Sequence, residues 1–228
     1  MTTGKAARLR TLRRFPQVFR RLAEARTALR VATGAVVLVQ LAVTSPAATP
    51  GGPVDFAELT QALRAFREKP SFDTAAGVRA LLPREGRIKF DDSTQARTAR
   101  EALDDTLPVL EAQVEAVDRD AIRLGLNLLA ATDPPISESL DAILGGLITT
   151  DAKVFLEELL RWRTDLPLRS LSQLVGTLGK EYAQQDRVAA CAEIQRRINA
   201  LLAVSEAALI QARDQCVAEL RLRRPRCG

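Results

Sequence analysis

The chain has 228 residues with 33 Lys and Arg, 28 Asp and Glu, and no histidine. Without histidine, catalytic centres of the Ser-His-Asp or Cys-His kind are excluded, and the commonest metal ligand is missing. The three cysteines are too few for a four-thiolate zinc site.

The net charge of +5 is concentrated in the first 48 residues, which hold nine Lys or Arg and one Glu. Residues 49–228 therefore carry a net charge of −3. A mildly acidic body gives little support to binding of a polyanion. We expect no nucleic-acid partner for the folded part of the chain.

Residues 1–48 have the order of an export signal. A basic stretch leads into an uncharged run at residues 31–43, which as a helix spans about 20 Å, less than the roughly 30 Å of a bilayer core. Ser45 and Ala47 supply the small residues that a signal peptidase requires. We expect cleavage near Ala47 or Ala48 and an extracytoplasmic location, either periplasmic or secreted.

An alternative follows from the length of the basic stretch, which at about 30 residues is long for a signal. If the leader remains uncleaved, residues 5–30 form an amphipathic basic helix suited to an anionic lipid surface. The protein is then membrane-tethered or peripheral, and it contacts the membrane only through this N-terminal segment.

Residues 49–54 are predicted to be a Pro/Gly linker, and residues 55–228 a single all-helical domain. Aromatic residues make up only 4% of the chain, and the abundant Ala and Leu favour helices over strands. Asp55 with Glu58 predicts the start of a first helix, which Pro70 ends.

The next elements are expected to be a short helix over residues 74–82 capped by Asp73, then a loop or an extended segment over residues 86–92. Ser93 begins a long helical pattern. Pro108 interrupts it, which indicates either a kink or the first turn of a new helix.

Asp118 is predicted to cap a helix over residues 119–131. Ser137 and Ser139 are cap candidates for the following helix. The remaining predicted elements are a helix capped by Thr150 or Asp151 that ends before Pro167, and a short helix after Ser170 that ends at Gly179.

The predicted helix starts near residues 93, 108, 119, 137, 151 and 169 lie eleven to eighteen residues apart, so neighbouring helices are expected to be short and antiparallel. The predicted fold class is all-α, stacked as a bundle or as a HEAT-like array, with a C-terminal helical hairpin or a single long helix. Residues 118–163 are similar in kind to HEAT-type helical hairpins, although they carry no repeated signature.

Two cysteines are the candidate site residues of the C-terminal helical stretch. If the chain reverses at residues 203–205, where Ser205 can cap a second helix, Cys191 and Cys216 face each other and a disulfide between them is possible. In a single unbroken helix they are roughly 37 Å apart and cannot be joined. Beside that pair Cys227 is left over, and three alternatives stay open for it: a free thiol, a disulfide between chains, or a disulfide in which it takes the place of one of the two partners.

Three other patterns are assigned structural roles. Neighbouring acids on a helix point about 100° apart, which is typical of solvent faces and caps rather than of catalytic dyads. Gly145 and Gly146 indicate close helix packing, and residues 176–180 resemble a phosphate loop only superficially and indicate a helix end. The acidic pairs are Asp91-Asp92, Asp104-Asp105 and Glu157-Glu158.

The sequence thus predicts an exported, non-enzymatic helical protein that serves as a protein-binding or scaffold module. No catalytic, cofactor-binding or metal-ligating residue is assigned. An enzyme that uses carboxylates alone would require several acids to converge in one pocket with raised pKa values.

Overall fold

The computed structural model describes residues 54–162, 169–179 and 187–223. The chain divides into two compact units, residues 1–45 and residues 46–228, and all the described residues belong to the second. They form eight α-helices and no strand, which confirms the predicted all-helical class. The leader and the linker up to residue 53 lie outside the described residues, so the export signal stays a prediction.

The helices alternate between short and long elements. Their bounds are α1 Phe56–Glu68, α2 Phe72–Leu81, α3 Thr94–Glu115, α4 Arg119–Ala131, α5 Ile136–Trp162, α6 Arg169–Gly176, α7 Arg187–Leu202 and α8 Ile210–Arg223.

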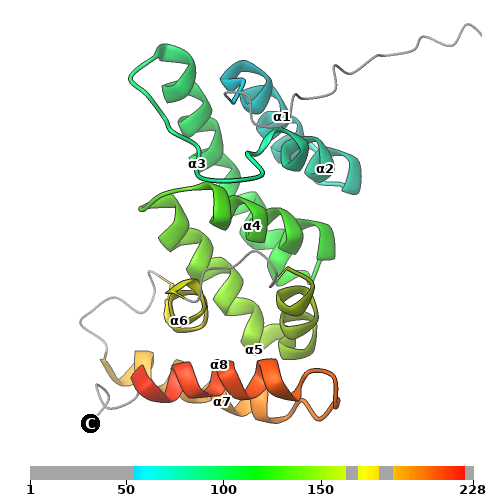
Figure 1. Cartoon of the computed structure of the whole chain (residues 1–228), viewed down its shortest axis with the longest axis vertical. Helices are drawn as coiled ribbons and strands as arrows, with labels where there is room; N and C mark the ends of the chain where they lie inside the picture. Colours follow the sequence, from blue (N-terminus) through cyan, green and yellow to red (C-terminus); the bar gives the residue numbers. More distant parts are fainter. Residues whose placement is uncertain (1–53, 163–168, 180–186, 224–228) are drawn as a thin grey trace, which may run out of the picture. The chain divides into compact units, whose positions relative to one another are not determined.

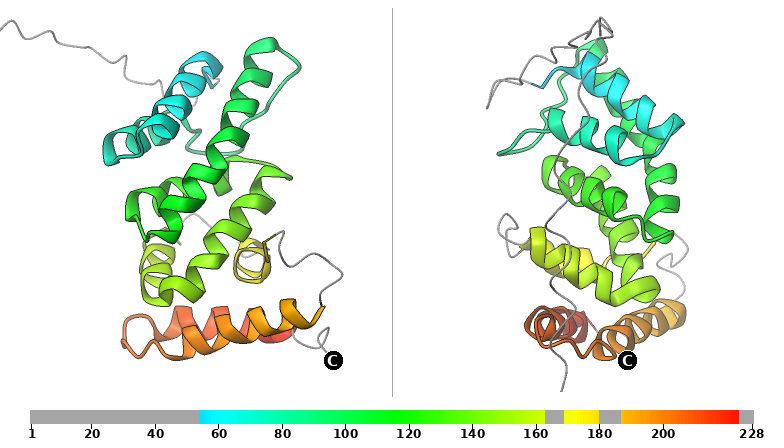
Figure 2. Two further views of the ribbon diagram at one scale, coloured as in Figure 1. Left: turned by 180° about the vertical axis from the view of Figure 1, so that it is seen from behind. Right: turned by 90° about the vertical axis from the view of Figure 1, so that its right-hand side faces the viewer.

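The helical unit is a bundle in which α5 is the central element (Figures 1 and 2). Helices α3 and α4 pack on one part of α5, and α6 and α7 pack on another. Helix α1 lies against α2 and α3, while α2 also contacts α4. Along the described residues, the core therefore runs from the α1–α3 end to the α7–α8 end. The HEAT-type repeat remains a hypothesis.

Local capping explains where several helices begin. The carboxylate of Asp55 accepts hydrogen bonds from the backbone amides of Ala57 and Glu58 at 2.9 and 3.0 Å. Asp118 caps α4 in the same way, and Ser93 caps α3. These three starts confirm the sequence predictions, because a side-chain oxygen satisfies amides that the first turn leaves without partners.

Two predicted caps are wrong. Helix α2 begins two residues earlier than expected, because Ser71 and Thr74 form a reciprocal capping box and leave Asp73 within the first turn. Helix α5 begins at Ile136, so Ser137 and Ser139 lie inside it rather than at its cap.

Two interruptions in the helical pattern have different outcomes. Pro108 lies inside an unbroken α3, so no new helix begins there. Asp151 has a non-helical backbone within α5, and its carboxylate accepts the amide of Val154 at 2.9 Å. Asp151 therefore caps the second half of α5, and it is one of the two residues that were predicted to cap a helix there.

The connection between α2 and α3 is a loop rather than a strand. It is held by Ile88, which is buried and whose amide donates to the carbonyl of Ala131 at 2.7 Å, and by Phe90, which stacks on Phe56 of α1. Of the two predicted alternatives for residues 86–92, the loop is confirmed.

Helices α7 and α8 form a hairpin, so a single long C-terminal helix is excluded. The connection covers residues 203–209, and α8 begins five residues after Ser205, which is therefore not its cap. The turn is centred near residue 206, so the position level with Cys191 is about residue 221 rather than Cys216.

This change of register corrects the predicted disulfide. An offset of five helical residues is about 7.5 Å along the axis, more than the usual Cα separation across a disulfide. Cys216 is buried on α8, and the structure does not join it to Cys191 of α7. Cys227 lies outside the described residues.

Candidate functional site

A pocket of about 170 Å³ opens where α2, α4 and the second half of α5 meet. We call it the arginine pocket. Its lining residues are Arg79, Arg123, Leu126, Asn127, Glu158, Arg161 and Trp162.

Glu158 is the organising residue of the arginine pocket. Its side chain is only 1% exposed, yet it forms ion pairs with three arginines. Its Oε1 accepts from Arg119 at 2.9 Å, from Arg123 at 3.0 Å and from Arg161 at 3.0 Å, and its Oε2 accepts from Arg123 at 2.8 Å. A buried carboxylate with this many donors fixes the arginine side chains around it.

The charge state of Glu158 follows from two opposing effects. Burial raises the pKa of its carboxyl, but the hydrogen bonds from Arg123 and Arg119, together with the charges of Arg123 and Arg161, outweigh burial and hold the pKa below its ordinary value. Hydrogen bonds to Glu157 and Glu158 raise the pKa of Arg119, and hydrogen bonds to Glu158 raise that of Arg123. Glu158 is therefore ionised at neutral pH and serves as a counter-ion to the arginines.

The prediction that the Glu157-Glu158 pair belongs to a solvent face is wrong for Glu158. Glu157 is partly exposed and pairs with Arg119 at 2.5 Å, whereas Glu158 is buried. The sequence carries a signal for this difference, because Glu158 lies three residues after the buried Phe155 and four before Trp162. It therefore falls on the apolar stripe of α5.

The other acidic pairs agree with surface and cap positions. Asp91 accepts from the amide of Ser93 at 3.0 Å, just before α3 begins. Asp105 forms a surface ion pair with Arg67 of α1 at 2.7 Å, with 64% of the Asp105 side chain exposed.

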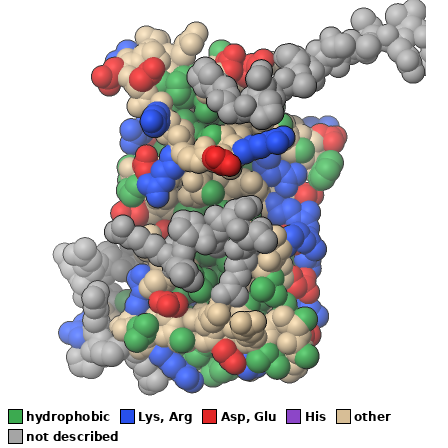
Figure 3. Space-filling view, in the orientation of Figure 1, with side chains coloured by type: hydrophobic (Ala, Val, Ile, Leu, Met, Phe, Trp, Pro, Cys, Tyr) green, Lys and Arg blue, Asp and Glu red, His purple; other side chains and the backbone are tan. Residues whose placement is uncertain are grey.

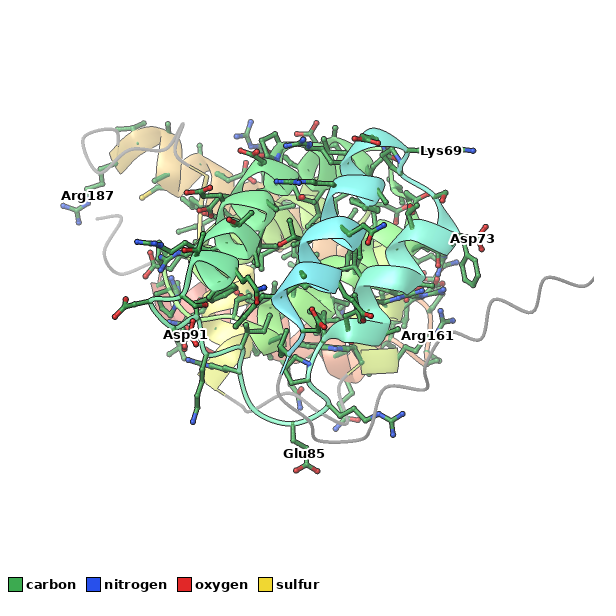
Figure 4. All side chains as sticks on the ribbon, turned by 90° about the horizontal axis from the view of Figure 1, so that it is seen from above. Lys69, Asp73, Glu85, Asp91, Arg161 and Arg187 are labelled. Carbon is green, nitrogen blue, oxygen red and sulfur yellow. The ribbon has the colours of Figure 1, made fainter. Side chains whose placement is uncertain are left out.

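The lining of the arginine pocket has an excess of positive charge, since three arginines face one glutamate. In Figure 3, Lys and Arg side chains form a band along the right-hand edge of the face shown, beside α2 and α4. Figure 4 shows Arg161 at the outer edge of the helical unit, on the same side of the view as Asp73 of α2. The pocket thus combines a fixed anion with cations that reach the surface.

The size of the arginine pocket limits what it can hold. Sites for cofactors and drug-sized molecules usually enclose about 300–1,000 Å³, so this pocket suits a single side chain or a small group. Within the described ranges, no group of three His, Cys, Asp or Glu residues is placed to hold a metal ion. None of the helices described here combines the length and apolar character needed to cross a bilayer.

A second polar cluster is buried where α5, α6 and α7 meet. Arg197 of α7 is 2% exposed and pairs with the buried Glu193 at 3.2 Å. Its Nη1 donates to the carbonyls of Val175 and Thr177 at 2.8 and 2.9 Å. Arg197 therefore satisfies carbonyl oxygens at the C-terminal end of α6, which the helix itself leaves without donors.

This cluster decides the role of the glycine-containing segment at residues 176–180. Helix α6 ends at Gly176, three residues before the predicted stop at Gly179. Carbonyl oxygens of Val175 and Thr177 are directed at a cation there, whereas a phosphate loop presents amides to an anion. The described part of the segment is thus a helix end, as predicted, and Lys180 lies outside the described residues.

Asp141 is a further buried carboxyl, 4% exposed on α5. Desolvation raises its pKa to about 7, opposed by the charge of Arg223 and assisted by that of Glu138. Asp141 does not line the arginine pocket. Glu158, which does, has a lowered pKa. Among the described residues, the acids thus do not meet in this pocket with raised pKa values.

Comparisons of the chain with protein-family models, with curated proteins and with solved structures find no match. The arginine pocket was not predicted from the sequence, because its residues come from three helices. Only tertiary packing brings Arg79 next to residues more than forty positions away. The positions that carry a candidate function are therefore identified from the geometry of this chain alone.

Proposed function

We propose that this chain is an exported, non-enzymatic binding module that recognises another protein through the arginine pocket. The observation that supports this proposal most strongly is the arginine pocket itself, where the buried Glu158 pairs with Arg123 and Arg161 beside Trp162. Arginine and tryptophan are enriched among residues that dominate protein–protein binding energies.

A protein partner suits the arginine pocket better than other ligand classes. The volume is small for an organic cofactor. A nucleic acid would require an extended basic surface, but residues 49–228 are acidic overall, and Asp120 and Glu157 pair with Arg123 and Arg119. A protein supplies single side chains that match a small pocket.

The test compares three tagged versions of the full chain in the cells that produce it: wild type, Arg79→Glu and Arg100→Glu. The side chain of Arg79 makes no hydrogen bond or ion pair with any described residue, so its replacement leaves the ion-pair cluster intact. Arg100 is exposed on α3, outside the pocket lining, and provides the same change of charge. After chemical crosslinking, quantitative mass spectrometry measures the recovered proteins.

We expect a defined protein partner with wild type and with Arg100→Glu, and at least a tenfold lower recovery with Arg79→Glu. A partner retained equally by all three versions would show that recognition occurs elsewhere. If no protein is enriched over an untagged control, the binding-module proposal is wrong.

The proposed export of the chain has its own measurement, because its basis is the leader at residues 1–48. The intact mass of the chain recovered from cell fractions should correspond to a species that begins near residue 48 and is found outside the cytoplasm. A full-length species in the membrane fraction would instead support the alternative, a membrane-tethered protein that retains its basic N-terminal segment.

A further inference from the structure

The arginines of the pocket differ in how many hydrogen bonds and ion pairs they make with described residues. Both oxygens of Glu158 already accept hydrogen bonds, and Arg123 is held by Nε and both Nη atoms. Arg161, by contrast, is 59% exposed and donates only through Nη1 to described residues. The guanidinium of Arg79 makes no hydrogen bond or ion pair within the described part of the chain. Two guanidinium groups thus remain able to bind an external anion.

The pocket also has an apolar side. Leu126 is 3% exposed and Trp162 is partly buried, and both line the same pocket as Arg79 and Arg161. A volume of about 170 Å³ accommodates one aliphatic side chain beside the ring of Trp162. A free inorganic anion would contact the arginines and leave this apolar surface exposed to water.

On the basis of the proposed function, we propose that the arginine pocket binds a short peptide segment of the partner in which an Asp or Glu adjoins an aliphatic residue. The carboxylate pairs with Arg79 and Arg161, and the aliphatic side chain packs against Leu126 and Trp162. Arginine suits this role because its planar guanidinium binds a carboxylate through two parallel hydrogen bonds.

The charge around the pocket limits how acidic the segment is. The lining has two more positive than negative charges, but residues 49–228 have a net charge of −3. Asp120 and Glu157, which pair with Arg123 and Arg119, lie at the border of the cluster. A long run of acidic residues would meet these carboxylates, so the segment carries one or two acids in a largely uncharged context.

The chain reports directly on this pocket, because Trp162 is its single tryptophan. The experiment titrates the full chain with four probes and follows Trp162 fluorescence. The probes are a peptide with one Glu beside one Leu among Gly and Ser residues, the same peptide with Gln in place of Glu, the same peptide with Ser in place of Leu, and inorganic phosphate. Salt is varied between about 0.05 and 0.5 M.

We expect the Glu-Leu peptide to change the fluorescence saturably and to bind at least tenfold more tightly than either substituted peptide. Binding should weaken as salt rises, because the ion pairs lie partly exposed. The variant Arg79→Gln should lower the affinity about tenfold, whereas Arg100→Gln, with the same loss of charge, should leave it unchanged.

The inference is overturned if the Gln peptide binds as well as the Glu peptide, or if phosphate alone reproduces the full change. Absence of any peptide binding overturns it as well. The proposed function fails separately: if Arg79→Glu still loses its crosslinked partner while no peptide binds, the pocket recognises a protein through other chemistry. If the peptide binds but no partner is recovered, the pocket chemistry stands without the proposed function.

Discussion

Replacing Gly145 by alanine is expected to destabilise the helical unit by about 2 kcal/mol, whereas the same change at Gly146 is expected to stabilise it by about 0.5–1 kcal/mol. The two glycines are neighbours on α5, but they face different surroundings. A Cβ on Gly145 would lie 2.5 Å from the carbonyl oxygen of Leu174 and 2.8 Å from Nη1 of Arg197. A Cβ on Gly146 would meet nothing within 4 Å.

The expected loss at Gly145 follows from which atoms would be displaced. The nearest contact is a backbone oxygen of α6, which cannot rotate away as a side chain can. The added methyl group therefore pushes α6 from α5, and this movement disturbs the hydrogen bonds from Arg197 to the end of α6. At Gly146, only the gain in helix propensity remains.

Urea unfolding followed by circular dichroism measures both free energies of unfolding, with wild type alongside. The difference between the two variants should be about 2.5–3 kcal/mol, because the effects have opposite signs. If Gly145→Ala is as stable as Gly146→Ala, α5 and α6 do not approach each other at this position in solution.

Local signals account for the elements that were predicted well. Asp118 caps α4, which covers residues 119–131 as expected, because capping depends on a few neighbouring residues. Asp151 is another such case, and α1 ends before Pro70. Where two cap candidates compete, as Ser71 and Asp73 do, the sequence alone did not identify the one that forms the reciprocal pair with Thr74.

Features that depend on packing were not predicted. The register of the α7–α8 hairpin is set by a seven-residue connection rather than by the three residues expected, which separates Cys191 from Cys216. Among adjacent acids, Glu158 is distinguished by its position on the buried stripe of α5. The two glycines at residues 145 and 146 were both assigned to close packing, and only Gly145 makes such a contact.

Replacing Arg197 by methionine is expected to cost about 3–5 kcal/mol of unfolding free energy. Methionine preserves much of the side-chain volume but removes the charge that pairs with Glu193, which is 5% exposed. It also removes the donor to the carbonyls of Val175 and Thr177. Without this donor, the carbonyl oxygens are buried without a hydrogen bond, and the free-energy cost of removing them from water is no longer offset.

Arg196 supplies a control on the same helix turn. It also pairs with Glu193, at 2.7 Å, but 62% of its side chain is exposed. Because water screens an exposed ion pair, Arg196→Met should cost less than about 1 kcal/mol. Equal losses in Arg196→Met and Arg197→Met would contradict a special role for the buried guanidinium.

Two further variants separate the lost charge from the lost hydrogen bonds. Arg197→Lys retains the charge, but its single ammonium group cannot reproduce the planar fork of arginine, so an intermediate loss is expected. It also keeps the test informative if Arg197→Met does not fold. Combining Glu193→Gln with Arg197→Met should restore part of the stability, because glutamine at position 193 is uncharged and does not need the buried guanidinium as a partner. If the double variant loses as much as the two single losses added together, Arg197 stabilises the fold mainly through the end of α6, independently of Glu193.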